Sequence, residues 1–110
     1  MPRSALLYGS DYARHAVVVV EGPADVWAVG PGAVATGGTA YTSAQLRLLA
    51  NYPVRAICFD NEPAAQRRAR ALAAALAPYP GTTHTVSMET GDDPAEAGPK
   101  EIRQLRRMFL

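Results

Sequence analysis

Acidic side chains recur in this sequence directly after runs of apolar residues. The acids that follow such runs are Glu21, Asp60, Glu62, Asp92 and Asp93, and Asp25 lies one helical turn beyond the first of them. Carboxylates gathered in one place repel one another, so such a set is favoured when a hard cation such as Mg²⁺ joins them through one or two direct ligands and several waters. Phosphate is the usual companion of such a cation. These residues therefore indicate phosphate chemistry, provided that the fold brings them together.

A pair of glycines follows another short apolar run, at residues 32–36. Gly37 and Gly38 are followed by Thr39. A chain without side chains lets a phosphate or a nucleic-acid backbone come close to its amide groups. We assign the same role to Gly22, in the loop after the first apolar run. The sequence thus predicts an approach for phosphate or nucleic acid beside the acids.

Hydrophobic patterning indicates strands that alternate with helices. The run Ala16–Val20 is unbroken and rich in β-branched residues, which is typical of a strand covered on both faces of a parallel sheet. Further strands are expected at residues 32–36, 54–59 and 82–88. Helices are expected at residues 24–29, at 43–52 after a capping-box spacing, from Pro63 along an alanine-rich stripe, and from Pro99 onward.

This alternation predicts an α/β fold with a sheet of about four parallel strands flanked by helices, because the connections are too long for hairpins and suit right-handed crossovers. Sites in open parallel sheets lie at the carboxyl ends of the strands. The acids should therefore share one edge of the sheet. Helix capping is the alternative for any single acid, but capping does not require acids after three strands.

Composition narrows the class of protein. The chain has 110 residues, of which 48% are hydrophobic and 19% charged, as expected for one globular domain. A net charge of +1 argues against a surface that is wholly a nucleic-acid clamp. The single cysteine, Cys58, excludes an internal disulfide and favours the cytoplasm. The longest apolar run is far too short to span a membrane, so we expect no membrane partner.

Other residues of types that can take part in catalysis or metal binding have simpler interpretations. His15 and His84 lack metal-ligand spacing and are expected at the surface, whereas Cys58, Trp27 and the methionines are expected in the core. The chain has no G-x-x-x-x-G-K-[ST] motif, no G-x-G-x-x-G motif and no paired cysteines. A P-loop NTPase, a standard dinucleotide-binding fold and a zinc module are therefore disfavoured.

Four segments, taken together, resemble the TOPRIM domain of bacterial- and phage-type DNA primases in order and spacing. They are E-G-x-x-D after the β-branched strand, then G-T-A, D-x-[DE] and D-P, within residues 17–25, 35–40, 57–64 and 91–94. The resemblance covers residues 6–97 and implies a compact, Rossmann-like parallel sheet between helices. We therefore expect residues 1–110 to form one TOPRIM domain with a core at 6–97 and a basic helix at 99–110.

The resemblance also implies roles for particular acids. Glu21 matches the invariant glutamate of the family, which is assigned to general acid/base work or metal binding. Asp60 and Glu62 match its D-x-D metal pair, with glutamate in place of the second aspartate. This departure keeps the charge and lengthens the side chain by one methylene. Asp25 matches the acid after the glutamate in the primase branch, and Asp93 matches the acid of the D-P segment, so both join the expected metal ligands.

The function implied by this resemblance is nucleotidyl transfer on nucleic acid, with Mg²⁺ or Mn²⁺ as cofactor and a DNA template and nucleoside triphosphates as partners. The basic template-binding subdomain and the zinc-binding region of primases have no counterpart in this sequence. We therefore expect an excised domain, or a small stand-alone protein that works with other primase or helicase domains or subunits.

Two alternatives remain open. A TOPRIM nuclease would use the same acids to activate water against a phosphodiester, although the E-G-x-x-D and D-P segments favour the primase branch. A non-catalytic module would use the acids for metal-dependent docking, with Arg103, Arg106 and Arg107 as a basic face. Those arginines also fit an ordinary solvated helix face.

Overall fold

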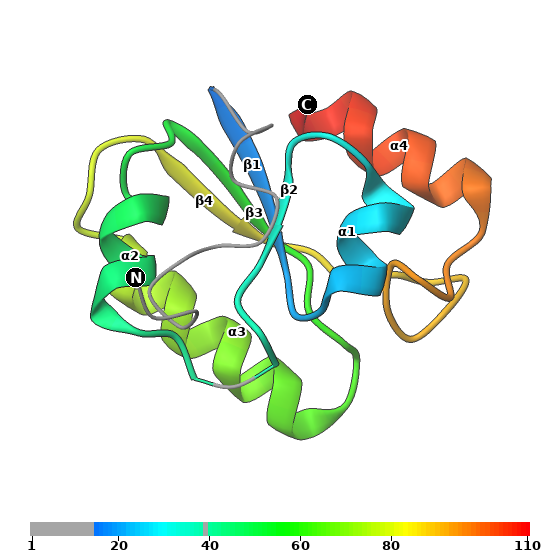
Figure 1. The fold of residues 1–110 in the computed structure, drawn as a ribbon, viewed down its shortest axis with the longest axis horizontal. Helices are drawn as coiled ribbons and strands as arrows, with labels where there is room; N and C mark the ends of the chain where they lie inside the picture. Colours follow the sequence, from blue (N-terminus) through cyan, green and yellow to red (C-terminus); the bar gives the residue numbers. More distant parts are fainter. Residues whose placement is uncertain (1–14, 39) are drawn as a thin grey trace.

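A sheet of four parallel strands in the order β2-β1-β3-β4 forms the centre of the molecule (Figure 1). The computed structural model describes residues 15–38 and 40–110. Its strands are β1 (Ala16–Val20), β2 (Ala33–Ala35), β3 (Val54–Ile57) and β4 (Thr82–Thr85). All three neighbouring pairs are parallel. The predicted α/β class and the predicted sheet of parallel strands are therefore confirmed.

Helices cover both faces of this sheet (Figure 1). They are α1 (Pro23–Val29), α2 (Ser43–Leu49), α3 (Pro63–Leu76) and α4 (Pro99–Phe109). A proline begins α1, α3 and α4, where its missing N–H group removes no helical hydrogen bond. The predicted capping box begins α2: the Thr42 hydroxyl accepts the Gln45 N–H at 3.1 Å, and the Gln45 carboxamide oxygen accepts the Thr42 N–H at 3.0 Å.

Strand β1 divides the core into two layers. Val17 and Val19 pack in the layer that includes residues of α2 and α3, whereas Val18 and Val20 pack with residues of α1 and α4. All four valines are fully buried. The unbroken apolar run is therefore explained by burial on both faces, as the sequence predicts.

Strand β4 is shorter than the expected segment 82–88 because its neighbour ends first. Val86 donates its N–H to the carbonyl of Ile57, the last residue of β3, at 2.8 Å. Beyond that point, residues 86–88 have no adjacent strand among the described residues with which to pair. Because β4 is an edge strand, its polar, largely exposed threonines suit its position.

The expected core position is wrong for Met108, which is 70% exposed, and for Trp27, which is 74% exposed. Its neighbours in α1, Val26 and Val29, face the sheet, and a helix of seven residues has room for only one buried stripe. Cys58 is buried, and His15 and His84 are exposed, as expected.

A buried arginine anchors the end of β3 that lies away from the acids. Arg55 is fully buried, and its guanidinium donates to the carbonyls of Tyr52 at 2.7 Å and Pro80 at 3.0 Å and to the Thr83 hydroxyl at 2.9 Å. Burial lowers the pKa of Arg55 below its usual range. These contacts tie the loop after α3 to β3.

Within the described residues, no helix is long and apolar enough to cross a bilayer.

Candidate functional site

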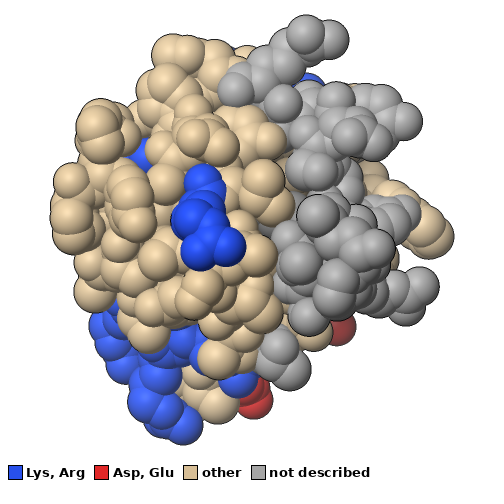
Figure 2. All heavy atoms as spheres, turned by 60° about the vertical axis from the view of Figure 1, so that its left-hand side comes forward, with Lys and Arg blue, Asp and Glu red and all other residues tan. Residues whose placement is uncertain are grey.

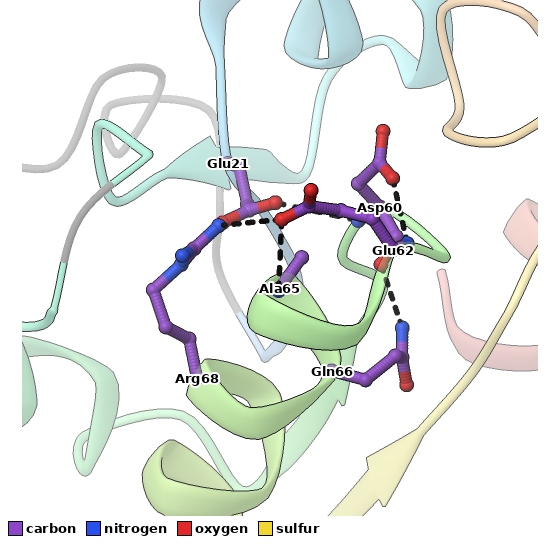
Figure 3. A network of polar contacts seen from close by, with 6 residues as sticks. All are labelled: Glu21, Asp60, Glu62, Ala65, Gln66 and Arg68. Carbon is purple, nitrogen blue, oxygen red and sulfur yellow. Dashed lines mark hydrogen bonds and ion pairs between the residues drawn. The ribbon is translucent and has the colours of Figure 1, made fainter.

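The acids that follow β1 and β3 meet at the carboxyl end of the sheet. Glu21 comes directly after β1, and Asp60 lies three residues beyond β3, which is the neighbouring strand. The Asp60 N–H points at Glu21 Oε1, with 3.4 Å between the nitrogen and the oxygen (Figure 3). Two residues that are 39 positions apart in the sequence are thus brought into contact.

A tight turn connects β3 to α3 and fixes the carboxylates of Asp60 and Glu62. Asp60 Oδ1 accepts the Glu62 N–H at 2.8 Å, and Gln66 Nε2 donates to the Asp60 carbonyl at 2.8 Å (Figure 3). Glu62 is the N-cap of α3, and its Oε1 accepts the Ala65 N–H at 3.2 Å. Glu62 therefore has the helix-capping role that is the alternative for a single acid. This capping uses only one of its two carboxylate oxygens.

Arg68 of α3 reaches back to the same acids (Figure 3). Its Nε and Nη2 atoms lie 2.9 Å and 2.7 Å from Glu21 Oε2, which makes a close ion pair. Its Nη2 also lies 3.9 Å from Glu62 Oε1. Arg68 is not among the functional residues predicted from the sequence. The available signal was the arginine-rich segment 67–70, one to two turns after the acidic turn.

Asp25 and Asp93 form a second acidic group. Asp25, in the first turn of α1, is buried, and its Oδ1 accepts the Ala95 N–H at 2.9 Å. Burial raises the pKa of Asp25, and the nearby Asp93 carboxylate raises it further, although the Ala95 N–H acts in the opposite direction. Asp93 Oδ1 accepts the Glu96 N–H at 3.0 Å. Asp25 is thus a carboxyl group in a partly dry site with a second carboxylate nearby.

The predicted acids therefore divide into one group around Glu21, Asp60 and Glu62 and another around Asp25 and Asp93. Among residues 15–38 and 40–110, no three His, Cys, Asp or Glu side chains are placed to hold a metal ion together. The roles of Asp60, Glu62, Asp93 and Asp25 as metal ligands, and of Glu21 as the catalytic residue, stay predictions.

Asn61 joins the turn after β3 to the segment that carries the second group. Its main-chain N–H donates to the Asp92 carbonyl at 2.9 Å, and its side-chain Nδ2 donates to the Met88 carbonyl at 2.9 Å. Nδ2 also lies 3.4 Å from the Gly91 carbonyl. In the sequence Asn61 only separates the two acids of the D-x-[DE] segment, and no sequence signal predicts this link.

Glu101 of α4 holds the start of the same segment, residues 89–96, which is called the acidic segment below. Its carboxylate accepts the N–H groups of Glu89 at 2.7 Å and Thr90 at 2.9 Å, and the Thr90 hydroxyl at 2.6 Å. The hydrogen bonds from the side chain and main chain of Thr90 are the main causes that lower the pKa of Glu101. The start of the acidic segment is therefore held by two residues, Asn61 and Glu101.

The glycines after β2 lie beside the backbone of Glu21. Gly37 donates its N–H to the Glu21 carbonyl at 2.9 Å. Gly37 and Gly38 have φ angles of +103° and +78°, a backbone conformation that favours glycine, and a Cβ atom at either position would meet no atom of the described residues within 4 Å. The open surface suits the predicted approach of a phosphate, which stays a prediction. Gly22 is the N-cap of α1, and Thr39 lies outside the described residues.

A family model described as Toprim-like matches residues 18–97, which include both acidic groups. The chain belongs to the Toprim-like family. The resemblance inferred from the four sequence segments is thereby confirmed. No curated protein sequence matches the chain.

Solved primase structures share the fold of this Toprim-like chain. The zinc-binding and RNA polymerase domains of the Aquifex aeolicus primase align over 100% of the chain with a TM-score of 0.80 and 23% identity. A DNA primase domain from Pseudomonas aeruginosa aligns over 100% with a TM-score of 0.71 and 24% identity, and the RNA polymerase domain of the Mycobacterium tuberculosis primase over 99% with 0.73 and 26%. The alignments cover only 31%, 36% and 42% of those chains.

Proposed function

We propose that this Toprim-like chain is the catalytic module of a primase-type protein and supports divalent-metal-dependent nucleotidyl transfer on nucleic acid. The observation that carries this proposal is the contact between Glu21 and the Asp60 turn at the carboxyl ends of two adjacent strands. The fold shared with primase domains supports the same conclusion. In this proposal the partners are a DNA template, nucleoside triphosphates and other primase or helicase domains.

The donor set suits Mg²⁺ or Mn²⁺. Asp60 and Glu62 each have one carboxylate oxygen fixed by a main-chain N–H, and the Glu62 side chain is 57% exposed. Mg²⁺ is usually held by one or two protein carboxylates, with waters and substrate phosphates completing its shell. When bound, such a cation would neutralise the charge on the reacting phosphates. In this proposal the carboxylates of Asp60 and Glu62 bind the cation directly. Asp93 and Asp25 form a neighbouring site for a cation on the same edge of the sheet.

Glu21 is the proposed acid/base residue. Its carboxylate is oriented by the Arg68 guanidinium on one oxygen and by the Asp60 N–H on the other. Its side chain is only 12% exposed, so little water competes for it. A carboxylate held in this way is suited to orient an attacking 3′-hydroxyl, and in this proposal it also accepts the proton of that hydroxyl. The exposed glycines after β2 lie beside it, where a phosphate group would approach.

Basic side chains lie on the face formed by α2 and α3. Figure 2 brings this side of the molecule forward and shows Lys and Arg side chains gathered toward one end of it. Arg47 of α2 and Arg67 and Arg70 of α3 are exposed, and neither helix contains an acidic residue. Arginines in such a position attract nucleic-acid phosphates. The face is continuous with the site, because α3 also carries Arg68.

The arginines of α4, which form the alternative basic face, are less suited to bind nucleic acid than those of α2 and α3. Arg106 directs its guanidinium inward and donates from Nη1 to the carbonyls of Val29 at 3.0 Å and Pro31 at 2.7 Å. This arginine therefore holds the loop after α1 and is less available to a partner. Arg103 and Arg107 are exposed and remain as an ordinary solvated face. The charge distribution thus favours α2 and α3 as the nucleic-acid side.

The metal assignment is tested by replacing Asp60 and Glu62 with Asn and Gln. At free Mn²⁺ about ten times its Kd, a folded-state ligand adds about 1.4 kcal/mol to the free energy of unfolding, or a rise in Tm of roughly 4–8 °C per kcal/mol. We expect this rise in the wild type and its loss in D60N/E62Q. The control E89Q/E96Q removes two exposed acids outside the site. Equal responses in all three proteins would contradict the assignment.

The reaction is tested by comparing primer synthesis with cleavage of single-stranded DNA, using Mg²⁺ or Mn²⁺. We expect little synthesis by the chain alone, because its net charge of +1 leaves little for gripping template phosphates. Synthesis should appear when the neighbouring primase or helicase domains are added, and Glu21→Gln should abolish it. Cleavage without synthesis in the same assembly would favour a nuclease instead.

A further inference from the structure

We propose that Arg68 is a positioning residue that fixes the Glu21 carboxylate and, through the same guanidinium, weakens the hold of the neighbouring acids on a divalent cation. This inference rests on the proposed metal-dependent function. It concerns a residue outside the acidic motifs, and it assigns Arg68 two effects that can be measured separately.

The contacts of Arg68 are concentrated on this site. Two of its nitrogens lie 2.9 Å and 2.7 Å from a single oxygen of Glu21, and the second of these also lies 3.9 Å from Glu62 Oε1. Both ion pairs observed between side chains of the described residues belong to Arg68. The guanidinium therefore lies between the proposed acid/base residue and a proposed metal ligand.

The position of Arg68 along α3 explains this reach. Ala65 and Ala69 belong to the buried stripe of the helix, whereas Arg67 and Arg70 are exposed. Arg68 borders the stripe, and its side chain is 29% exposed. Its aliphatic part can follow the helix while its charged end reaches the edge of the sheet, as is usual for long basic side chains. The planar guanidinium can then hold a carboxylate in one orientation, which an ammonium group does less well.

The charge of Arg68 acts on cation binding in a definite direction. Acids that face one another attract a cation more strongly when no other positive charge is near. Arg68 supplies such a charge within 4 Å of Glu62. Because the site is partly exposed, solvent reduces the effect to the range of exposed ion pairs. Removing the charge should therefore tighten Mn²⁺ binding by about two- to fivefold, which corresponds to the upper part of that range.

The test measures Mn²⁺ affinity by calorimetry in the wild-type chain, Arg68→Gln, Arg68→Lys and the control Arg67→Gln. We expect tighter binding in R68Q only. R68K keeps the positive charge and should stay within about twofold of the wild type. R67Q removes an exposed arginine from the adjacent position and should leave the affinity unchanged. Circular dichroism establishes that each variant is folded.

The positioning role is read separately from the ¹³C resonance of the Glu21 carboxyl carbon without metal. R68Q and R68K should both shift this resonance, because neither provides the guanidinium fork, whereas R67Q should not. An R68Q protein that binds Mn²⁺ no more tightly than the wild type, or an unshifted Glu21 resonance in both Arg68 variants, would overturn the inference. Absence of Mn²⁺ binding by the wild type would overturn the proposed metal function together with it. If the Arg68 variants behave as expected but the complete assembly makes no primer, only the proposed reaction would be overturned.

Discussion

The side-chain amide of Asn61 donates a hydrogen bond to the main-chain carbonyl of Met88 across the carboxyl edge of the sheet, at 2.9 Å. Asn61 belongs to the turn that holds Asp60 and Glu62, and Met88 precedes the segment that carries Asp93. The two acidic groups are therefore connected by an uncharged residue. The connection predicts that Asn61 sets their spacing.

Replacing Asn61 with Ala should lower the free energy of unfolding by about 1–2 kcal/mol, because a part-buried carbonyl loses its donor. Thermal unfolding should show a fall of roughly 4–8 °C per kcal/mol for a domain of this size. The control is Asn51→Ala, at an exposed position just after α2. Equal losses in the two variants would show that the link across the site contributes nothing particular.

Replacing Arg55 with Met should lower the free energy of unfolding by about 3 kcal/mol, because the part-buried carbonyls of Tyr52 and Pro80 lose the charged donor of a fully buried side chain. Arg55→Lys should recover only part of the loss, since one ammonium group cannot reproduce the fan of guanidinium donors. Urea denaturation measures both, with the exposed Arg47→Met as control. A change of less than about 1 kcal/mol in R55M would contradict the anchoring role.

The contribution of Glu101 should depend on pH. Hydrogen bonds from Thr90 hold the native pKa of Glu101 below its usual value. The stability it supplies is therefore fully present above the unfolded-state pKa and is lost as the pH falls through the native pKa. At pH 7, Glu101→Gln should lower the free energy of unfolding by about 0.5–1 kcal/mol.

Urea titrations of the wild type and E101Q between pH 7 and pH 3 measure this effect, and the difference between the two proteins should shrink toward low pH. Glu96→Gln, at an exposed acid of the same segment, is the control. A difference that stays constant, or that grows, as the pH falls would contradict the assignment.

The thiol of Cys58 should not react in the native protein. Burial, with the charges of Asp25, Glu101 and Asp93 as further causes, raises the pKa of Cys58 to about 12. Only about one molecule in ten thousand would carry the thiolate at pH 8, and the thiolate is the reactive form. A disulfide reagent at pH 8 should therefore label the chain only after urea is added. Rapid, complete labelling without urea would show that the core opens at β3.

Local signals in the sequence determined the framework of this protein. The valine run of β1, the prolines that begin three helices and the Thr42 capping box act through neighbouring residues, so they predict the parallel α/β sheet and place acids at its carboxyl edge. The order of four acidic and glycine-containing segments was also sufficient to indicate the family. All of these signals can be read without knowing which distant residues meet in the folded chain.

Tertiary structure alone decided how the acids are grouped and what holds them. Arg68 meets Glu21 across 47 positions of sequence, and Asp25 meets the N–H of Ala95 across 70. Hydrophobic periodicity assigns a residue to a face of a helix or strand, but it does not give the rotamer or the packing angle that lets two distant side chains meet. The exposure of Trp27 has the same origin, because the packing of α1 selects one stripe for burial.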